Sequence, residues 1–147
     1  MDYILTENGW VKNDKHSDFG KYMYHICPVY RGKKSRFFPY IPRFAKENGE
    51  NYRTKRICVS PSIKQCIMGI DGIENLEYST LEVGKSWFVY RTHEKGTPAK
   101  SVCDFEITHE HWIKKETSFE YFGKLHRIGE NDFAVFKNKK IIFELDY

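Results

Sequence analysis

The feature that most constrains the fold is a helix start near the middle of the chain, at Ser60-Pro61-Ser62. Serine is a favoured N-cap, and proline suits the first helical position because it has no amide hydrogen to leave unpaired. Apolar side chains then recur at the spacing of one helix face, at Ile63, Cys66, Ile67 and Ile70. Gly69 and Gly72 favour a stop. The pattern predicts an amphipathic helix over residues 61–70, capped by Ser60 and packed on a sheet.

Runs of apolar, aromatic and β-branched residues on both sides of this helix predict strands. These runs cover residues 21–27, 56–59, 86–92, 102–107, 118–126, 132–136 and 140–145. Asn138 tolerates a positive φ, so the last two strands are expected to form a terminal hairpin. A single helical turn from Thr108 through Trp112 and a second helix near residues 6–19 complete the predicted elements.

These elements add up to an α+β fold with a mostly antiparallel, curved or split β-sheet and one or two packed helices. Six or seven strands are expected. The 147 residues fit a single globular domain spanning residues 1–147. Because the chain has 11 Phe, 10 Tyr and 3 Trp, the core is expected to be rich in aromatic rings, and a disordered chain is excluded.

The cysteines indicate a reducing compartment. Cys27, Cys58, Cys66 and Cys103 all have apolar neighbours, and none forms a C-x-x-C pair. We therefore expect buried free thiols rather than disulfides. The first residues lack the pattern of a signal peptide, and no apolar run approaches the roughly 18 residues that span a bilayer. The expectation is a cytoplasmic protein without a membrane partner.

A long irregular segment over residues 30–55 is the first functional candidate. Residues 31–56 hold nine Lys and Arg side chains, but only Glu47 and Glu50 as acids, and aromatic rings are interleaved among them. Rings and cations together suit phosphate binding and base stacking. A solvated loop anchored to the core by its rings is the alternative. The candidate partner-binding residues are Arg31, Arg36, Arg43 and Arg53.

The second candidate is His109-Glu110-His111. Two histidines two residues apart share one face of a strand, but zinc needs at least one further ligand and no spacing supplies it. We therefore predict no metal site here, and a surface turn anchored by Trp112 is the alternative reading. Glu110 is a lone carboxylate that can orient a ribose hydroxyl or act as a general base.

The other candidates are His25 and the helix start at Ser60. A lone histidine on a strand is either a structural group or a ligand. The free N–H groups at a helix start attract anions, and Arg56 would reinforce that site with charge. Glycine-rich phosphate loops and a nucleophilic serine elbow are absent from the sequence, which excludes the nucleotide-binding and hydrolase classes that use them.

Taken in order, Tyr24-His25, residues 56–62 and residues 106–112 resemble the small ADP-ribosyltransferase-like domains of the diphtheria-toxin type. The resemblance implies NAD as cofactor, with His25 on the adenosine ribose and Ser60 at the edge of the nicotinamide pocket. Glu110, or else Glu106, would hold the nicotinamide ribose and promote cleavage of the glycosidic bond. The basic loop would lie over the phosphates. The Ser-Thr-Ser triplet and the paired tyrosines of that family are missing here.

Two functions follow. The first is a small binding or inhibitory module, of the kind carried by phages and mobile elements against host defences. It would recognise a nucleotide, a nucleic acid or a host protein through the basic aromatic loop. The alternative is an NAD-dependent ADP-ribosyltransferase that modifies a macromolecule.

Overall fold

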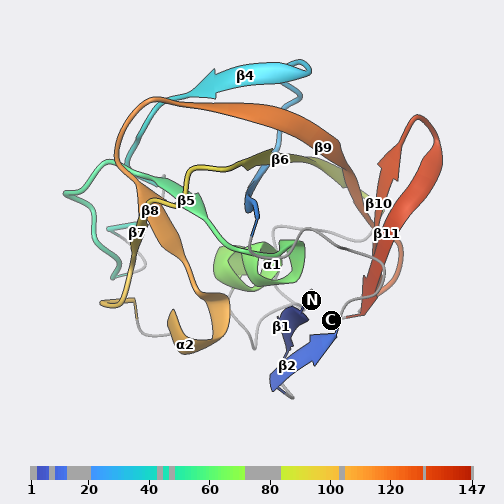
Figure 1. Cartoon of the computed structure of the whole chain (residues 1–147), viewed down its shortest axis with the longest axis horizontal. Coiled ribbons are helices and arrows are strands. Elements are labelled where there is room, and N and C mark those ends of the chain that lie inside the picture. Colours follow the sequence, from blue (N-terminus) through green and yellow to red (C-terminus); the bar gives the residue numbers. More distant parts are fainter. Residues whose placement is uncertain are drawn as a thin grey trace.

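The fold is seen in a computed structural model (Figure 1). It describes residues 3–6, 9–12, 21–42, 45–46, 49–71, 84–102, 105–130 and 132–146. The strands are β1 (Tyr3–Thr6), β2 (Gly9–Lys12), β3 (Met23–Cys27), β4 (Lys34–Phe37), β5 (Ile57–Val59), β6 (Ser86–Thr92), β7 (Thr97–Pro98), β8 (His111–Ile113), β9 (Thr117–Arg127), β10 (Asp132–Lys137) and β11 (Lys140–Asp146). The helices are α1 (Ile63–Asp71) and α2 (Phe105–Thr108).

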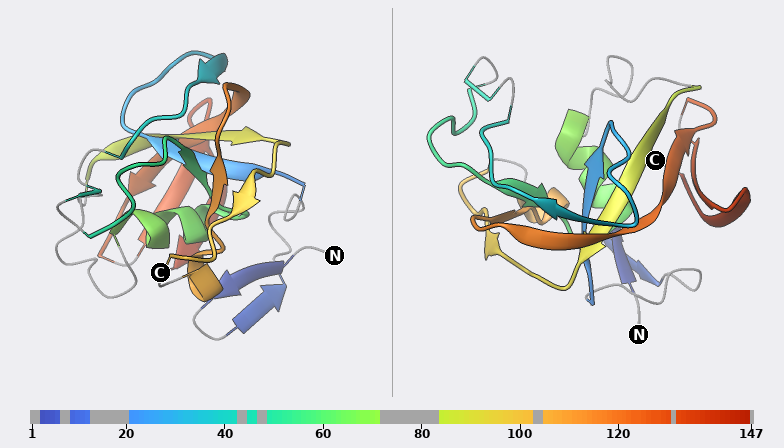
Figure 2. Two further views of the ribbon diagram at one scale, coloured as in Figure 1. Left: turned by 90° about the vertical axis from the view of Figure 1, so that its left-hand side faces the viewer. Right: turned by 90° about the horizontal axis from the view of Figure 1, so that it is seen from above.

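The largest sheet has the strand order β11-β10-β9-β6-β3, and β4 pairs with the first part of β9. Every pairing in it is antiparallel. The long strand β9 joins this sheet together, since Glu120 lies opposite both Lys34 of β4 and Arg91 of β6. Figure 2 shows β9 running across the molecule toward the β10–β11 hairpin.

A second, three-stranded sheet has the order β5-β8-β7, and β1 and β2 form a separate hairpin. The second sheet meets the first through a bridge between Tyr24 and Ser60, whose N–H groups donate to each other's carbonyls at 2.8 and 3.1 Å. The predicted α+β class with a mostly antiparallel, split sheet is confirmed. No helix within the described segments is long and apolar enough to cross a membrane.

Helix α1 lies under the arch of β6 and β9 (Figure 1). Its buried face, with Ile63, Cys66 and Ile67, packs in a cluster with Tyr24 of β3 and with Val89, Leu125, Phe133 and Val135. A second cluster holds Met23, Cys27, Phe37, Ile57, Val59, Tyr90, Ile113 and Phe119. Since successive residues of a strand point to opposite faces, β3 contributes to both. Both faces of the main sheet are therefore buried near β3.

The predicted helix exists, but its start was assigned two residues too early. Ser62 is the cap, because its Oγ accepts the N–H of Gln65 at 3.2 Å and contacts Gln65 Oε1 at 2.9 Å. A serine hydroxyl that accepts the N–H of the third helical residue is a standard N-cap, and here the same hydroxyl donates to the Gln65 side chain. The predicted cap, Ser60, is held instead in its bridge to Tyr24. Ile70, the last residue of the predicted apolar face, is 44% exposed.

Three other predictions were wrong. The strand predicted over residues 102–107 is helix α2 from Phe105 onward, and residues 103 and 104 lie outside the described residues. The helical turn predicted from Thr108 through Trp112 is not formed. Helix α2 ends at Thr108, because His109 takes a left-handed φ of 48° and strand β8 follows. The predicted helix near residues 6–19 is contradicted by strand β2, where tryptophan and valine favour extended backbone and glycine disfavours a helix. Residues 7, 8 and 13–19 of that prediction lie outside the described residues.

The expected irregular segment over residues 30–55 also contains strand β4, which pairs with β9 and buries Phe37. Tertiary pairing overrides its strongly charged local sequence. By contrast, the strand over residues 86–92 and the terminal hairpin are confirmed, and Asn138 has the expected positive φ, 53°. The described strands number eleven rather than six or seven.

Candidate functional site

The turn from Asn51 to Arg56 is held by hydrogen bonds of its own side chains. Asn51 Oδ1 accepts the backbone N–H groups of Arg53 at 2.8 Å and of Thr54 at 2.9 Å. Asn51 Nδ2 also donates to Thr54 Oγ1 at 3.0 Å. An Asx turn of this kind fixes the backbone without strand pairing. The turn is therefore preformed, and the positions of its remaining side chains follow from it.

Arg56 fastens this turn from inside the molecule. The residue is 3% exposed, and Nη1 donates to the carbonyls of Asn51 at 2.7 Å and Thr54 at 2.9 Å. Its guanidinium carbon lies 4.4 Å from the centre of the Trp112 ring. Arg56 Nε is buried and has no acceptor among the described residues. The residue predicted to bind a cofactor thus holds the loop in place.

Trp112 contacts both Arg56 and Glu110. The indole Nε1 donates to Glu110 Oε2 at 2.8 Å, and the Glu110 carbonyl accepts the N–H of Ala99 at 2.9 Å. The other carboxylate oxygen lies beside Gly69 of α1, 3.8 Å from where a Cβ there would stand. The predicted catalytic carboxylate therefore belongs to a packed polar cluster beside α1, where it orients the tryptophan.

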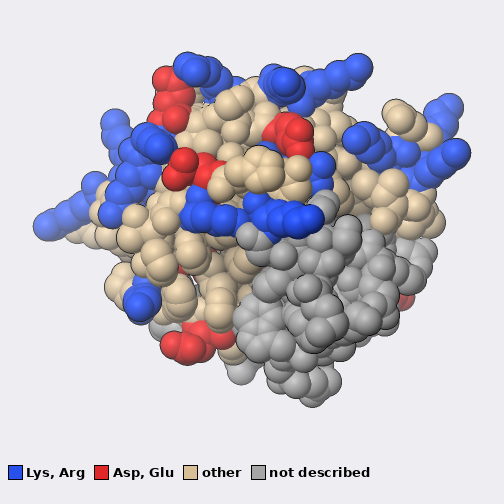
Figure 3. All heavy atoms as spheres, in the orientation of Figure 1, with Lys and Arg blue, Asp and Glu red and all other residues tan. Residues whose placement is uncertain are grey.

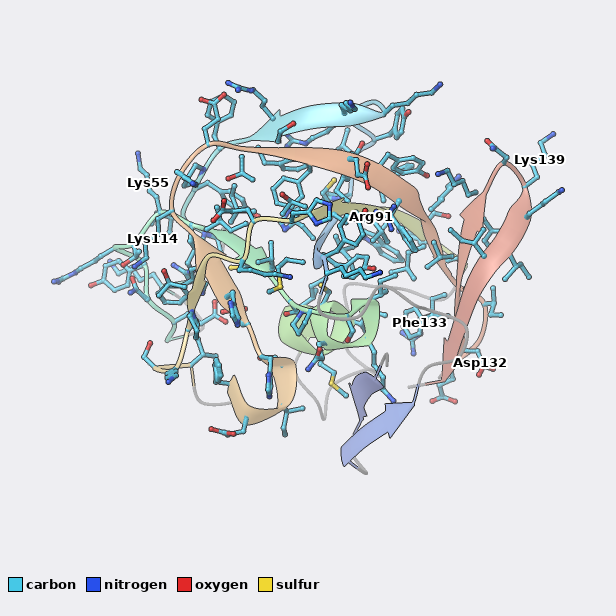
Figure 4. All side chains as sticks on the ribbon, viewed as in Figure 1. Lys55, Arg91, Lys114, Asp132, Phe133 and Lys139 are labelled. Atoms are coloured by element: carbon cyan, nitrogen blue, oxygen red, sulfur yellow. The ribbon has the colours of Figure 1, made fainter. Side chains whose placement is uncertain are left out.

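The exposed side chains of the turn are an aromatic ring and cations. Tyr52 is 42% exposed, with Lys46 Nζ 5.4 Å and Arg53 Cζ 5.5 Å from its ring centre. Lys55 and Lys114 are also exposed, and they flank the paired residues Ile57 and Ile113 of β5 and β8. Figure 4 shows both lysines on the same side of the molecule, far from Lys139 at the hairpin tip. The turn thus carries a preformed cationic, aromatic surface.

The segment around β4 adds to this surface through the bridge between Tyr40 and Arg56. Phe38 and Tyr40 are 61% and 47% exposed. Of the predicted partner-binding residues, Arg31 lies over the Phe37 ring at 4.9 Å, and Arg36 pairs with Glu116 at 2.6 Å. Arg43 lies outside the described residues.

We call the exposed residues Phe38, Tyr40, Lys46, Tyr52, Arg53, Lys55 and Lys114 the basic aromatic surface. In Figure 3, Lys and Arg side chains lie at this end of the molecule and along β4, and others lie in the centre and at the end that holds the β10–β11 hairpin. Arg53, Lys55 and Lys114 form no ion pair with any described acid. Their charges are therefore available to a partner.

His25 lies inside the core. Its ring packs edge-on against Phe37, with centroids 5.4 Å apart, and near Phe119, and its Nδ1 lies 2.8 Å from the Cys58 carbonyl. Burial lowers the pKa of His25, the nearby Arg31 charge lowers it further, and the hydrogen bond opposes both. A structural role for His25, rather than a role as a ligand, accounts for each of these contacts.

The predicted NAD-contacting residues are near one another in the fold but do not face one cleft. His25 points to the Phe37 side of the sheet. Ser60, as the antiparallel partner of Tyr24, lies on the opposite face with α1, since neighbouring residues of β3 alternate. Ser60 is 3% exposed, and Glu110 contacts Trp112. The resemblance to ADP-ribosyltransferases stays a prediction.

The described cysteines Cys27, Cys58 and Cys66 are free thiols. Burial, together with the charge of Glu110, raises the pKa of both Cys58 and Cys66 to about 12. Burial also raises the pKa of Cys27. Because the thiolate is the nucleophile, burial of these thiols disfavours a nucleophilic role at neutral pH. Cys103 lies outside the described residues.

An open pocket of about 270 Å³ lies elsewhere, beside the Arg91–Glu120 ion pair, and His25, Ser60 and Glu110 do not line it. Its walls include Tyr22 and His93, whose rings stack at 4.2 Å. Among the described residues, no three His, Cys, Asp or Glu side chains are grouped as metal ligands would be. His111 Nδ1 contacts the Lys95 carbonyl at 2.9 Å.

The sequence interpretation missed the most informative parts of this surface. Asn51 three residues before Thr54 is a local signal for an Asx turn, and it could have located the preformed turn. Lys114 could not have been found, since only the pairing of β5 with β8 brings it beside Lys55. The stacking of Arg56 on Trp112 likewise depends on this pairing.

Comparisons of the chain with protein-family models, with curated proteins and with solved structures found no match.

Proposed function

We propose that this chain is a binding module that recognises nucleic acid through the basic aromatic surface. The observation that carries the proposal is the turn at Asn51–Arg56, whose backbone is locked from inside while Tyr52, Arg53 and Lys55 are exposed. A preformed loop loses less conformational entropy when it binds. Exposed cations without acidic partners suit a phosphate backbone, which dominates affinity in such complexes.

A protein partner would suit this surface less well. Interface centres are depleted in lysine and enriched in apolar area. Here Lys46, Lys55 and Lys114 lie among the rings. Nucleic acid uses both components, since cations contact phosphates and rings contact bases. Catalysis is not needed for this function, and Glu110 is engaged with Trp112.

The test is fluorescence anisotropy with labelled oligonucleotides across a range of salt concentrations. Affinity should fall steeply with salt, because bound phosphates release counterions. Reversing the charge at Arg53 and Lys55 together should weaken binding about tenfold or more and make the salt slope shallower by about one to two. Folding of the variant is checked by circular dichroism.

The matched control reverses Lys139 and Lys140, which are also exposed but lie at the tip of the β10–β11 hairpin (Figure 4). It changes net charge by the same amount at the other end of the molecule, so its loss of affinity should be clearly smaller. Absence of binding to every oligonucleotide at low salt would refute the proposal. Equal losses for the two double variants would show that the attraction is not located on this surface.

A further inference from the structure

The basic aromatic surface includes three large aromatic side chains that are exposed to solvent. Phe38, Tyr40 and Tyr52 are 61%, 47% and 42% exposed. They come from two segments that are fourteen residues apart at Phe38 and Tyr52, and the Tyr40–Arg56 bridge brings those segments together. Large apolar side chains that gather on a surface indicate an interaction site, whereas single ones are common.

These rings are differently available for stacking. Tyr52 already has cations near its ring, Lys46 and Arg53. Burial raises the pKa of Tyr40, so the phenol is partly enclosed while the residue remains 47% exposed. Phe38 is the most exposed and has no ring or cation partner among the described residues. A Phe side chain has no polar group that gains from water, so an apolar or π-stacking partner would stabilise it.

The form of nucleic acid decides which of these groups can be used. In a duplex the base faces are stacked inside, and a protein reaches phosphates and groove edges, usually with a helix or a two-stranded ribbon. This surface is formed by loops and a strand end, which suit neither groove. In a single strand every base offers a π face, and stacking on aromatic side chains tolerates any sequence.

We infer that the basic aromatic surface binds single-stranded nucleic acid, with bases stacked on Phe38 and Tyr52 and phosphates held by Arg53, Lys55 and Lys114. This inference rests on the proposed function and specifies its ligand. It assigns separate tasks to the two kinds of side chain: the rings require bases, and the cations require only phosphates. That separation makes the inference testable independently of nucleic-acid binding itself.

The test compares four labelled probes of equal length at one salt concentration: a single-stranded DNA, the same sequence as RNA, a blunt duplex, and an abasic DNA strand that keeps the phosphates. The wild-type chain should bind the single strands best. The duplex and abasic strands should bind at least fivefold more weakly, because each base stacked on a ring contributes appreciably to affinity. The DNA and RNA arms show which single strand is preferred.

Phe38→Leu and Tyr52→Leu keep the net charge and remove the stacking rings. Each should weaken single-strand binding several-fold, leave abasic binding unchanged and leave the salt slope unchanged. Tyr30→Leu is the matched control. Tyr30 is 47% exposed, but its ring already packs at 5.7 Å from Phe88 and 5.0 Å from Tyr121, so its removal should have little effect.

Three outcomes would overturn the inference while sparing the proposed function. The first is equal affinity for normal and abasic strands, and the second is duplex binding as tight as single-strand binding. Loss of abasic binding in the two leucine variants would also overturn it, since the rings would then act through folding or charge placement. If no probe binds at all, the proposed function itself fails, and this result is distinguishable from the other three.

Discussion

The guanidinium of Arg56 lies 4.4 Å from the centre of the Trp112 ring and is almost wholly buried there. The contact joins the turn before β5 to the neighbouring strand β8. Cation–π pairs of this kind contribute about 2 kcal/mol or more when they are desolvated. The exposed ring of Tyr52 and the exposed cations on the same turn therefore depend on a buried cation for their position.

Arg56→Lys should loosen the turn although it conserves charge. A lysine ammonium cannot place a planar fork on Trp112 and bond two carbonyls in the same geometry. We expect a loss of about 1.5–3 kcal/mol in the free energy of unfolding, the range for hydrogen bonds of charged groups. Amide exchange of Arg53 and Thr54 should also accelerate. Urea unfolding and hydrogen exchange measure these effects; Arg53→Lys, at an exposed position, is the control and should stay within about 0.5 kcal/mol of wild type.

Two glycines should respond to alanine in opposite directions. A Cβ at Gly123 of β9 would lie 2.5 Å from Val135 Cγ1 and 2.9 Å from the Phe136 carbonyl oxygen. Overpacking of this kind costs about 1–3 kcal/mol. Gly69 is exposed in α1 with its nearest contact at 3.8 Å, so alanine there should stabilise by about 0.5–1 kcal/mol. Thermal unfolding of the two variants gives both signs, and a stabilised Gly123→Ala would disprove the pairing of β9 with β10.

Cys58 and Cys66 should resist alkylation in the folded protein. Their pKa values are raised to about 12, so at pH 8 almost no thiolate is present, whereas an ordinary cysteine is partly ionised. Incubation with iodoacetamide followed by peptide mapping should show labelling of both only after unfolding in urea. Rapid labelling of Cys58 in the native state would show that the turn opens and exposes the cluster around Arg56.

His25 should make stability depend on pH. Because burial lowers its folded-state pKa, the unfolded chain binds the proton more readily, and stability falls as pH drops below about 6.5. Above that value both states are neutral and the dependence disappears. His25→Asn keeps a donor for the Cys58 carbonyl but cannot titrate. Urea unfolding between pH 7.5 and 5.5 should show that the free energy of unfolding declines less steeply for the variant than for wild type. An unchanged decline would mean that other groups cause it, such as His111 and His126, whose pKa values burial also lowers.

The parts of the fold that sequence predicted well are those with local causes. The hairpin at Asn138 needs only a residue that accepts a positive φ, and the strand Ser86–Thr92 needs only β-favouring residues. The helix start was misplaced because Ser60 is an equally good cap in isolation. Its backbone is engaged by Tyr24, thirty-six residues away, and that pairing leaves the capping to Ser62.

The site was predictable only in composition. The interleaving of rings and cations over residues 31–56 located the basic aromatic surface, with Arg53 among its exposed residues. The roles of Arg56 and Glu110 could not be predicted from the sequence, since each depends on where the pairing of β5 with β8 places Trp112. Charge and residue type do not show which of two neighbouring arginines is exposed and which is buried.

The dependence of β4 and β6 on β9 has a consequence for synthesis. Among the described residues, 34–37 pair only with residues 117–120 of β9, and β6 pairs with residues 120–126 of the same strand. On the ribosome, where chains emerge from the N-terminus, the charged segment around β4 must wait until most of the polypeptide has been made. Its abundance of lysine and arginine keeps this waiting segment in water and hinders premature association with other nascent chains.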